Sequence, residues 1–343
     1  MVKKIGIGLI GAGSIADRHN AGYATSDNAE VVAVADKDRA IAEEKKTLYG
    51  AQKSYTRYED LLRDPRVDAV SICLPNIFHA PAAIAAAEAG KHILVEKPMA
   101  TSVKECDSMI AAAKKNHVKL MVDHNQLFFP PHNEAKRLIE TEIGKPLILL
   151  TRVHSGLPYA GWRLDPKVTG GGVLTEAGVH RVYLARYLMG EVNRVSCMTA
   201  KLSPDRLSED IALATMEFKN GSYGSVCANL GGPFPVWDDR TEVVGSQGLI
   251  IVNGCEDQVM DGPPLLFYKD GGWRIYGRPR RGLMTTYEME WDSHNTVAYS
   301  TQHFVECIAN DKTPMVTGED GRRVIEILMA CYKSAEKGTT IQL

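Results

Sequence analysis

The stretch "GLIGAGSIADRH", residues 8–19, decides how the first part of the chain folds. It ends an apolar run and opens a helical pattern, and "GAGSIA" within it matches the GxGxxG/A pattern. Gly11 permits a tight turn, Gly13 lets a pyrophosphate approach the backbone, and Ala16 allows close helix packing. The start of the helix offers unpaired N–H groups to phosphates. The expected contacts of a dinucleotide are therefore Gly11, Gly13, Ser14, Ile15 and Ala16.

A second strand-like run, residues 30–36, ends in Asp36, where the ribose-binding acid of such a unit is expected. Its carboxylate would accept hydrogen bonds from the adenosine ribose and repel a 2′-phosphate. Lys37 and Arg39 follow, and they could neutralise a phosphate if Asp36 turned away. We therefore expect NAD, with NADP less favoured and Lys37 as a further cofactor contact.

The first third of the chain alternates strands with helices. Strand-like runs lie at residues 4–10, 30–36, 68–74, 92–96 and 119–123. Helical patterns separate them, and Ser102 with Glu105 fits a capping box. This alternation predicts a parallel sheet covered on both faces by helices, as a first domain over residues 1–125.

After Gly144 the texture changes to short strand-like runs broken by Gly, Asn and Pro. These runs predict a mainly antiparallel sheet, in a second domain over residues 126–343. Thr317 with Asp320 caps a final helix that Gly338 stops, and this helix can pack back on the first domain.

Lys97 stands at the carboxyl end of the run "HILVE", on the expected cofactor side of the sheet. Ligands of parallel sheets bind outside the carboxyl ends of the strands. Pro98 follows, and a cis peptide bond there could aim the lysine side chain. We expect Lys97 to be functional.

The segment "GGGVLTEAGVH", residues 170–180, places Glu176 and His180 four positions apart. On an α-helix that spacing directs both side chains to one face. The three glycines are expected to admit a substrate close to the backbone. An imidazole, with an ordinary pKa near about 6.5, suits a general base at this point.

Composition narrows the partners. The chain has 343 residues, with 40 basic against 42 acidic side chains, so no field attracts nucleic acid or an anionic membrane. The sequence contains no run of about 18 apolar residues, so it predicts no membrane-spanning helix. Seven widely spaced cysteines argue against a disulfide framework and structural zinc, so we expect a cytoplasmic protein without a metal.

Taken together, "GLIGAGSIADRH", "CLPNIFH", "GKHILVEKPMA" and "GGGVLTEAGVH" resemble the Gfo/Idh/MocA oxidoreductase family, which includes glucose-fructose oxidoreductase and inositol dehydrogenase. The resemblance covers essentially the whole chain. It implies a Rossmann domain, doubly wound, followed by an α/β domain with a large open sheet. That sheet often forms dimer or tetramer contacts in the family, which implies a homodimer or homotetramer.

The resemblance also implies site residues. Lys97 and His180 would line the substrate site, and Glu176 stands where the family usually has Asp. Other positions would approach the cofactor: Leu74, Pro75, Asn76, His79, Glu96, Lys97, Asn125, Trp162 and Arg163. Weaker candidates for substrate contacts are His154, Tyr159 and Tyr299.

These residues suggest hydride transfer between nicotinamide and a secondary alcohol or ketone of a sugar, inositol or related polyol. His180 would act as base, Lys97 would stabilise the developing negative charge on the reacting oxygen, and Glu176 would bind an adjacent hydroxyl or orient Lys97. Two alternatives stay open. One is an enzyme that retains NAD and cleaves glycosides through transient oxidation at C3, and the other is a non-catalytic NAD-dependent sensor.

Overall fold

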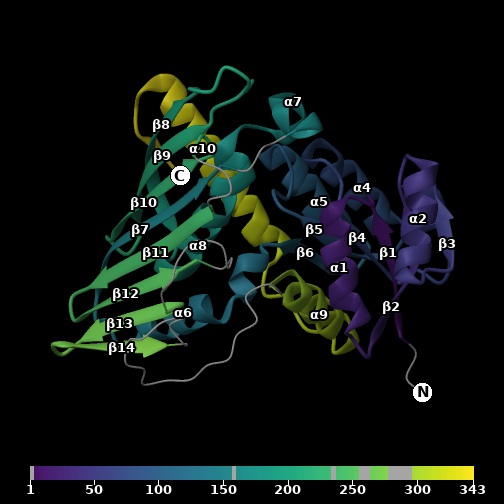
Figure 1. The fold of residues 1–343 in the computed structure, drawn as a ribbon, viewed down its shortest axis with the longest axis horizontal. Helices are drawn as coiled ribbons and strands as arrows, with labels where there is room; N and C mark the ends of the chain where they lie inside the picture. The colour runs from purple at the N-terminus through teal and green to yellow at the C-terminus, as the bar shows by residue number, and fades with distance from the viewer. Residues whose placement is uncertain (1–3, 157–159, 233–236, 255–262, 277–295) are drawn as a thin grey trace. The chain divides into compact units, whose positions relative to one another are not determined.

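A computed structural model of the chain describes residues 4–156, 160–232, 237–254, 263–276 and 296–343 (Figure 1). The chain divides into two compact units, the first comprising residues 1–125 with 297–325, and the second residues 126–296 with 326–343. We expected everything after residue 125 to lie in the second domain. Residues 297–325 instead cluster with the first unit, because Ser300 bonds to Asp123 and the hydroxyl of Thr301 fills the space beside Gly22.

The first unit is built on a six-stranded parallel sheet in the order β3-β2-β1-β4-β5-β6. The strands are β1 Ile5–Ile10, β2 Ala29–Ala35, β3 Lys53–Tyr55, β4 Ala69–Ile72, β5 His92–Glu96 and β6 Leu120–Asp123. Because the order turns back at β1, the crossover helices fall on both faces, which confirms the doubly wound Rossmann arrangement. The short β3 was absent from the sequence expectation.

The helices of the first unit connect these strands (Figure 1). They are α1 Ser14–Ala24, α2 Arg39–Tyr49, α3 Tyr58–Leu62, α4 His79–Glu88 and α5 Val103–Lys115, with α9 Thr296–Ala309 added from late in the sequence. Ser102 accepts a hydrogen bond from the backbone N–H of Glu105, so the expected cap of α5 is present. The last helix, α10 Gly318–Lys337, begins at the expected Thr317–Asp320 cap.

The second unit carries a nine-stranded sheet in the order β14-β13-β12-β11-β7-β10-β9-β8-β15 (Figure 1). Its strands are β7 Pro146–Ser155, β8 Val192–Ala200, β9 Ile211–Phe218, β10 Tyr223–Asn229, β11 Trp237–Gly245, β12 Gly248–Asn253, β13 Leu265–Lys269, β14 Gly272–Tyr276 and β15 Ile341–Gln342. All pairs are antiparallel except β7 with β10, so the expected mainly antiparallel open sheet is confirmed.

One face of this sheet is covered by helices α6 Pro130–Thr141 and α8 Val179–Met189. Strand β9 shows the resulting alternation, because Ala214 and Met216 are buried while Leu213 and Thr215 point to the open face. The short helix α7 Pro166–Thr169 precedes α8. Among the described residues no helix has both the length and the apolar character to cross a membrane.

Candidate active site

The glycine loop follows β1 in the first unit. Gly11 has φ 87°, and a Cβ there would lie 2.4 Å from the carbonyl oxygen of Cys73, so only glycine fits. Gly13 differs: its backbone is extended, and a Cβ would meet nothing within 4 Å. Gly13 is also the N-cap of α1, and no side chain caps the helix N–H groups there. Open space and uncapped N–H groups are what a pyrophosphate requires, so the loop fits a dinucleotide.

The structure fixes Asp36 beside this loop, at the end of β2. One carboxylate oxygen accepts the backbone N–H of Ala12 at 3.0 Å, and the other accepts that of Asp38 at 2.9 Å. Two backbone donors therefore hold the side chain toward the loop. The side chains of Lys37 and Arg39 are exposed. Each Asp36 oxygen keeps acceptor capacity for a ribose hydroxyl.

Beyond β4, the segment Leu74, Pro75 and Asn76 leads to His79 at the start of α4. His79 is wholly buried, and its two ring nitrogens each lie 2.8 Å from a carbonyl oxygen, those of Leu74 and Pro98. A carbonyl only accepts, so both contacts are hydrogen bonds when both ring nitrogens carry a proton. His79 thereby joins the two segments that were expected to line the cofactor site.

Lys97 follows β5 and is half-buried, and the Lys97–Pro98 peptide bond is cis, as the sequence suggested. The buried carboxylate of Glu96 accepts the backbone N–H of Lys97 at 3.1 Å. Asn125 follows β6, so it stands at the same carboxyl edge of the sheet as Lys97. Tyr299, expected from the second domain, lies on α9 in the first unit and is half-buried.

A buried cluster behind Lys97 was missed by sequence reasoning. His19 on α1 lies 3.0 Å from Glu96 and 3.2 Å from Asp123, and none of its surface is exposed. The available signal was helical spacing, since Ala16, His19 and Tyr23 form the buried stripe of α1. A histidine in that stripe must find polar partners in the core.

In the second unit, Glu176 lies in a π-helix, Leu174–Gly178, and α8 begins only at Val179. We expected one α-helix to carry both Glu176 and His180. Around Glu176 a wider π-helical turn replaces the expected α-helix. The spacing of an α-helix therefore does not give the relative directions of the Glu176 and His180 side chains. Glu176 is buried and His180, in the first turn of α8, is half-buried. π-helical turns are rare and frequent at functional sites.

At Gly171 and Gly172, two of the three glycines before this turn, protein atoms fill the space beside the Cα, whereas the sequence was expected to leave it for a substrate. Gly171 has φ 157°, and a Cβ there would lie 2.2 Å from the hydroxyl of Tyr332. At Gly172 a Cβ would lie 2.2 Å from the carbonyl oxygen of Glu209. These glycines are needed because protein atoms already fill the space beside them.

Glu209 and Tyr332, both missed from the sequence, brace the segment. The Glu209 carboxylate accepts the N–H groups of Gly172 at 3.0 Å and Leu174 at 3.2 Å, and the Tyr332 hydroxyl at 2.7 Å. Burial raises the pKa of Glu209, although these hydrogen bonds oppose the shift. The π-turn therefore rests on contacts from residues far along the chain.

Arg163 and Trp162 stand in a short 3-10 helix, Gly161–Leu164, of the second unit. The guanidinium of Arg163 lies 4.8 Å from the centre of the Trp162 ring, and its Nε lies 3.3 Å from Glu176 Oε2. The structure thus brings Glu176 together with Arg163. The role that we expected for this pair toward the nicotinamide stays a prediction.

His154 does not join this group. On β7, Val153 faces α8, as does its β11 partner Asp239, which pairs with Arg181 of α8 at 3.2 Å. His154 is the next residue, so its side chain points to the opposite face of the sheet, and its role as a substrate contact stays a prediction. Tyr159 lies outside the described residues.

Comparisons with known proteins give one consistent result. The Gfo/Idh/MocA family model, described as an oxidoreductase family with an NAD-binding Rossmann fold, matches residues 5–124, and the model of that family's C-terminal alpha/beta domain matches residues 136–343. The chain is 31% identical to myo-inositol 2-dehydrogenase of Thermotoga maritima, with 98% of each chain covered. It is 30% identical to scyllo-inositol 2-dehydrogenase (NAD(+)) of Bacillus subtilis, covering 100% of this chain and 97% of that one. Levoglucosan dehydrogenase in complex with NADH superposes with a TM-score of 0.90 at 26% identity over 99% of both chains.

Proposed function

The chain belongs to the Gfo/Idh/MocA oxidoreductase family, and from that premise we propose that it transfers a hydride between NAD and a secondary alcohol of an inositol, a sugar or a related polyol. The carboxyl edge of the parallel sheet carries the proposal. There the glycine loop, Asp36 and Lys97 follow β1, β2 and β5, so parallel strands bring all three to one edge. Two inositol dehydrogenases among the relatives make inositols the first substrates to try.

The matching family model describes an NAD-binding Rossmann fold, and the residues present fit NAD. The loop Gly11–Ala16 would hold the pyrophosphate, and Asp36 would hold the adenosine ribose and oppose a 2′-phosphate. When bound, NAD supplies a hydride acceptor next to the substrate. The proposed chemistry requires no metal ion.

The protein's own residues handle the proton and the charge. The alcohol loses a hydride and a proton as the ketone forms, and His180 takes the proton from the hydroxyl group. The ammonium group of Lys97 binds that oxygen and stabilises its negative charge as the proton leaves. Glu176, held by Arg163, accepts a hydrogen bond from a neighbouring hydroxyl of the substrate. The reverse reaction returns the proton from His180 to the carbonyl oxygen.

A substrate panel tests the proposal. Myo-inositol, scyllo-inositol and common aldoses and glycosides are incubated with NAD or NADP in parallel, and NADH or NADPH formation is followed by absorbance. We expect net NADH with at least one polyol and slower turnover with NADP. Glycoside cleavage without net NADH would identify the NAD-retaining alternative, and cofactor binding without turnover would identify a sensor.

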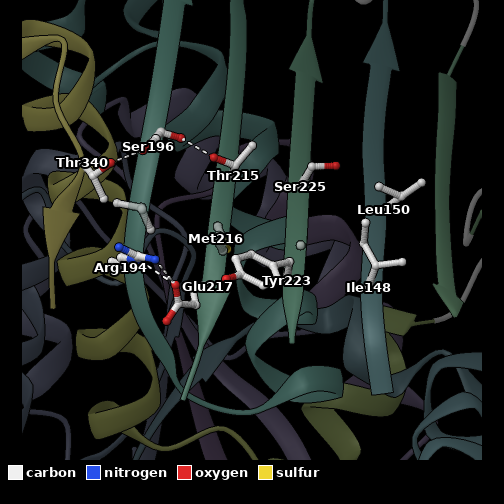
Figure 2. A pocket seen from close by; sticks show the side chains of 12 residues that line it. Ile148, Leu150, Arg194, Ser196, Thr215, Met216, Glu217, Tyr223, Ser225 and Thr340 are labelled. Atoms are coloured by element: carbon white, nitrogen blue, oxygen red, sulfur yellow. Dashed lines mark hydrogen bonds and ion pairs between the residues drawn. The ribbon is translucent and has the colours of Figure 1, made fainter. Parts of the chain in front are cut away.

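We further propose that the open face of the second sheet binds a second copy of the chain. Figure 2 shows this face, where Tyr223 of β10 stands beside the Arg194–Glu217 ion pair and Ile148 and Leu150 lie on β7, beyond β10. Its exposed apolar residues include Ile148, Leu150, Met198, Leu213 and Tyr223. A row of large apolar side chains on a flat sheet is typical of an interface. Leu150→Asp is expected to shift the protein toward monomer in light scattering, while Leu48→Asp, at an exposed site on α2, should not.

The cysteines agree with a cytoplasmic protein, which we also propose. In the described part of the chain six cysteines are free, and five of these are buried. A reducing compartment keeps such thiols unpaired.

A further inference from the structure

The cluster behind Lys97 joins four elements of the first unit through one buried imidazole. His19 Nε2, on α1, lies 3.0 Å from Glu96 Oε1 at the end of β5 and 3.2 Å from Asp123 Oδ2 at the end of β6. The other ring nitrogen lies 3.1 Å from the hydroxyl of Ser71 on β4. Ser300 of α9 donates to the remaining oxygen of Asp123 at 2.6 Å.

The charges in this cluster require a cation. Two carboxylates buried this deeply are costly unless a positive charge pairs with them, and His19 is the basic group between them. Burial alone would lower the pKa of His19, but the contacts with Asp123 and Glu96 oppose it, and that pKa is raised well above its usual value. The same pairing lowers the pKa of Glu96 despite its burial.

The other titratable groups that face His19 are Tyr23, Cys73 and Asp123. Burial raises the pKa of Tyr23, on the same helix, and that of Cys73, just after β4. Burial also raises the pKa of Asp123. Among these contacts, the one to Glu96 links His19 to the backbone that carries Lys97.

That carboxylate also holds the backbone of Lys97. Glu96 uses Oε1 for His19 and Oε2 for the backbone N–H of Lys97, at 3.1 Å. On the far side of the lysine, His79 holds the carbonyl oxygen of Pro98 at 2.8 Å. The peptide that carries Lys97 is thus fixed at both ends by side chains from the core.

We propose that His19 is a positioning residue for Lys97: its imidazolium fixes the Glu96 carboxylate, and the carboxylate fixes the peptide from which the Lys97 ammonium group reaches the substrate. This inference rests on the function proposed above for Lys97. It also ties α1, which starts at the glycine loop, to the strand end that carries Lys97. A histidine that only filled space in the core would affect stability without affecting Lys97.

The test compares His19→Gln with His92→Gln. His92 is a half-buried histidine at the opposite end of β5, where it accepts the backbone N–H of Lys119 at 3.0 Å. We expect His19→Gln to lower kcat by about 10²-fold, because small misplacements of a reacting group cost that much. The Kd for NAD and the substrate KM should change by less than about threefold, and His92→Gln should leave kcat unchanged.

A second readout needs no turnover. The lysines are converted to ¹³C-dimethyl-lysine and the Lys97 signal, assigned with Lys97→Arg, is titrated by NMR in the folded apoprotein. His19→Gln should move the Lys97 signal or its titration midpoint, and His92→Gln should not. An unchanged Lys97 signal in folded His19→Gln, or an equal shift in both variants, would overturn the proposal.

Asp123→Asn covers the case in which His19→Gln does not fold. The amide keeps the shape of Asp123 but removes one of the two carboxylates beside His19, so His19 should lose its proton at a lower pH than in the wild type. The Lys97 signal should then show a transition on raising the pH that the wild type lacks over the same range, and its absence contradicts the proposal. If Lys97→Met keeps full activity, the proposed function fails, whatever the NMR titration shows about His19.

Discussion

The carboxyl edge of the parallel sheet and the turn before α8 both contain glycine-rich segments, but different surroundings lie beside their glycines. At the sheet edge, Gly13 leaves open space and the backbone itself is offered to a ligand. In the turn, Gly171 and Gly172 are filled in by Tyr332 and Glu209. Similar glycine-rich sequences therefore leave open space for a ligand in one unit and allow close packing of protein atoms in the other. The contrast teaches that glycine composition indicates a close approach, but not what approaches.

The largest effect is expected at the sheet edge. Lys97→Met removes the ammonium group that we propose to stabilise the reacting oxygen, and kcat should fall by roughly 10³-fold. The Kd for NAD, measured by fluorescence titration, should stay close to that of the wild type because the glycine loop is untouched. Loss of NAD binding together with activity would place Lys97 in cofactor binding alone.

The next effect is expected in the second unit. His180→Asn removes the proposed base, which should lower kcat by about 10²-fold or more. The kcat of the wild type and of the variant is measured from pH 6 to 9. A variant that keeps the wild-type rate and pH profile over pH 6 to 9 rules out His180 as the base.

Paired alanine substitutions sharpen the comparison of the two glycine segments. Gly13→Ala should weaken NAD binding with little change in stability, since its Cβ meets no protein atom. Gly172→Ala should cost about 1–3 kcal/mol of stability, because its Cβ would press on Glu209. Urea unfolding and NAD titration of both proteins measure the two effects, and the opposite pattern would reverse our interpretation of the segments.

Two buried histidines extend the comparison to pH. His132, on α6 in the second unit, has its pKa lowered to about 3 by burial and by Arg181. The unfolded chain binds a proton there between pH about 6.5 and about 3 that the folded chain does not, so stability falls as the pH drops through that window, by up to about 1.4 kcal/mol per pH unit. His132→Gln should flatten this slope in urea unfolding.

The first unit should behave in the opposite sense. The folded pKa of His19 is raised, so its contribution is fully present below the unfolded pKa and is lost as the pH rises through the folded value. As the pH rises into the alkaline range, we therefore expect the backbone amides of β5 and β6, which hold this cluster, to lose protection from hydrogen exchange first. If hydrogen exchange in β5 and β6 changes with alkaline pH in Asp123→Asn as it does in the wild type, the His19 cluster is not the cause of that change.

The predictability of the two regions differs for a physical reason. The common edge at which Gly11, Asp36 and Lys97 lie could be predicted from sequence because each stands at the end of a strand, and parallel strands place their ends together without further information. His19 signalled itself only as a polar residue in a buried helical stripe. Its partners Glu96 and Asp123 come from other strands, and no local pattern links them.

The structure of the second unit was harder to predict from the sequence. The π-turn around Glu176 depends on Glu209 and Tyr332, whose contacts with it span long stretches of chain. The face of the sheet to which His154 points could not be predicted, because it depends on the register of β7 with β11, which a single strand does not reveal. Strand existence was read correctly for β7, β9 and β10, because local alternation is enough for that.

Isotope transfer tests the central claim most directly. The best polyol from the substrate panel, deuterated at the carbon that bears the oxidised hydroxyl group, is incubated with NAD and the wild-type protein. We expect one deuterium in the nicotinamide ring for each ketone formed, and almost none with Lys97→Met. Deuterium that stays with the sugar, or ketone formed without labelled NADH, would contradict hydride transfer as the reaction of this protein.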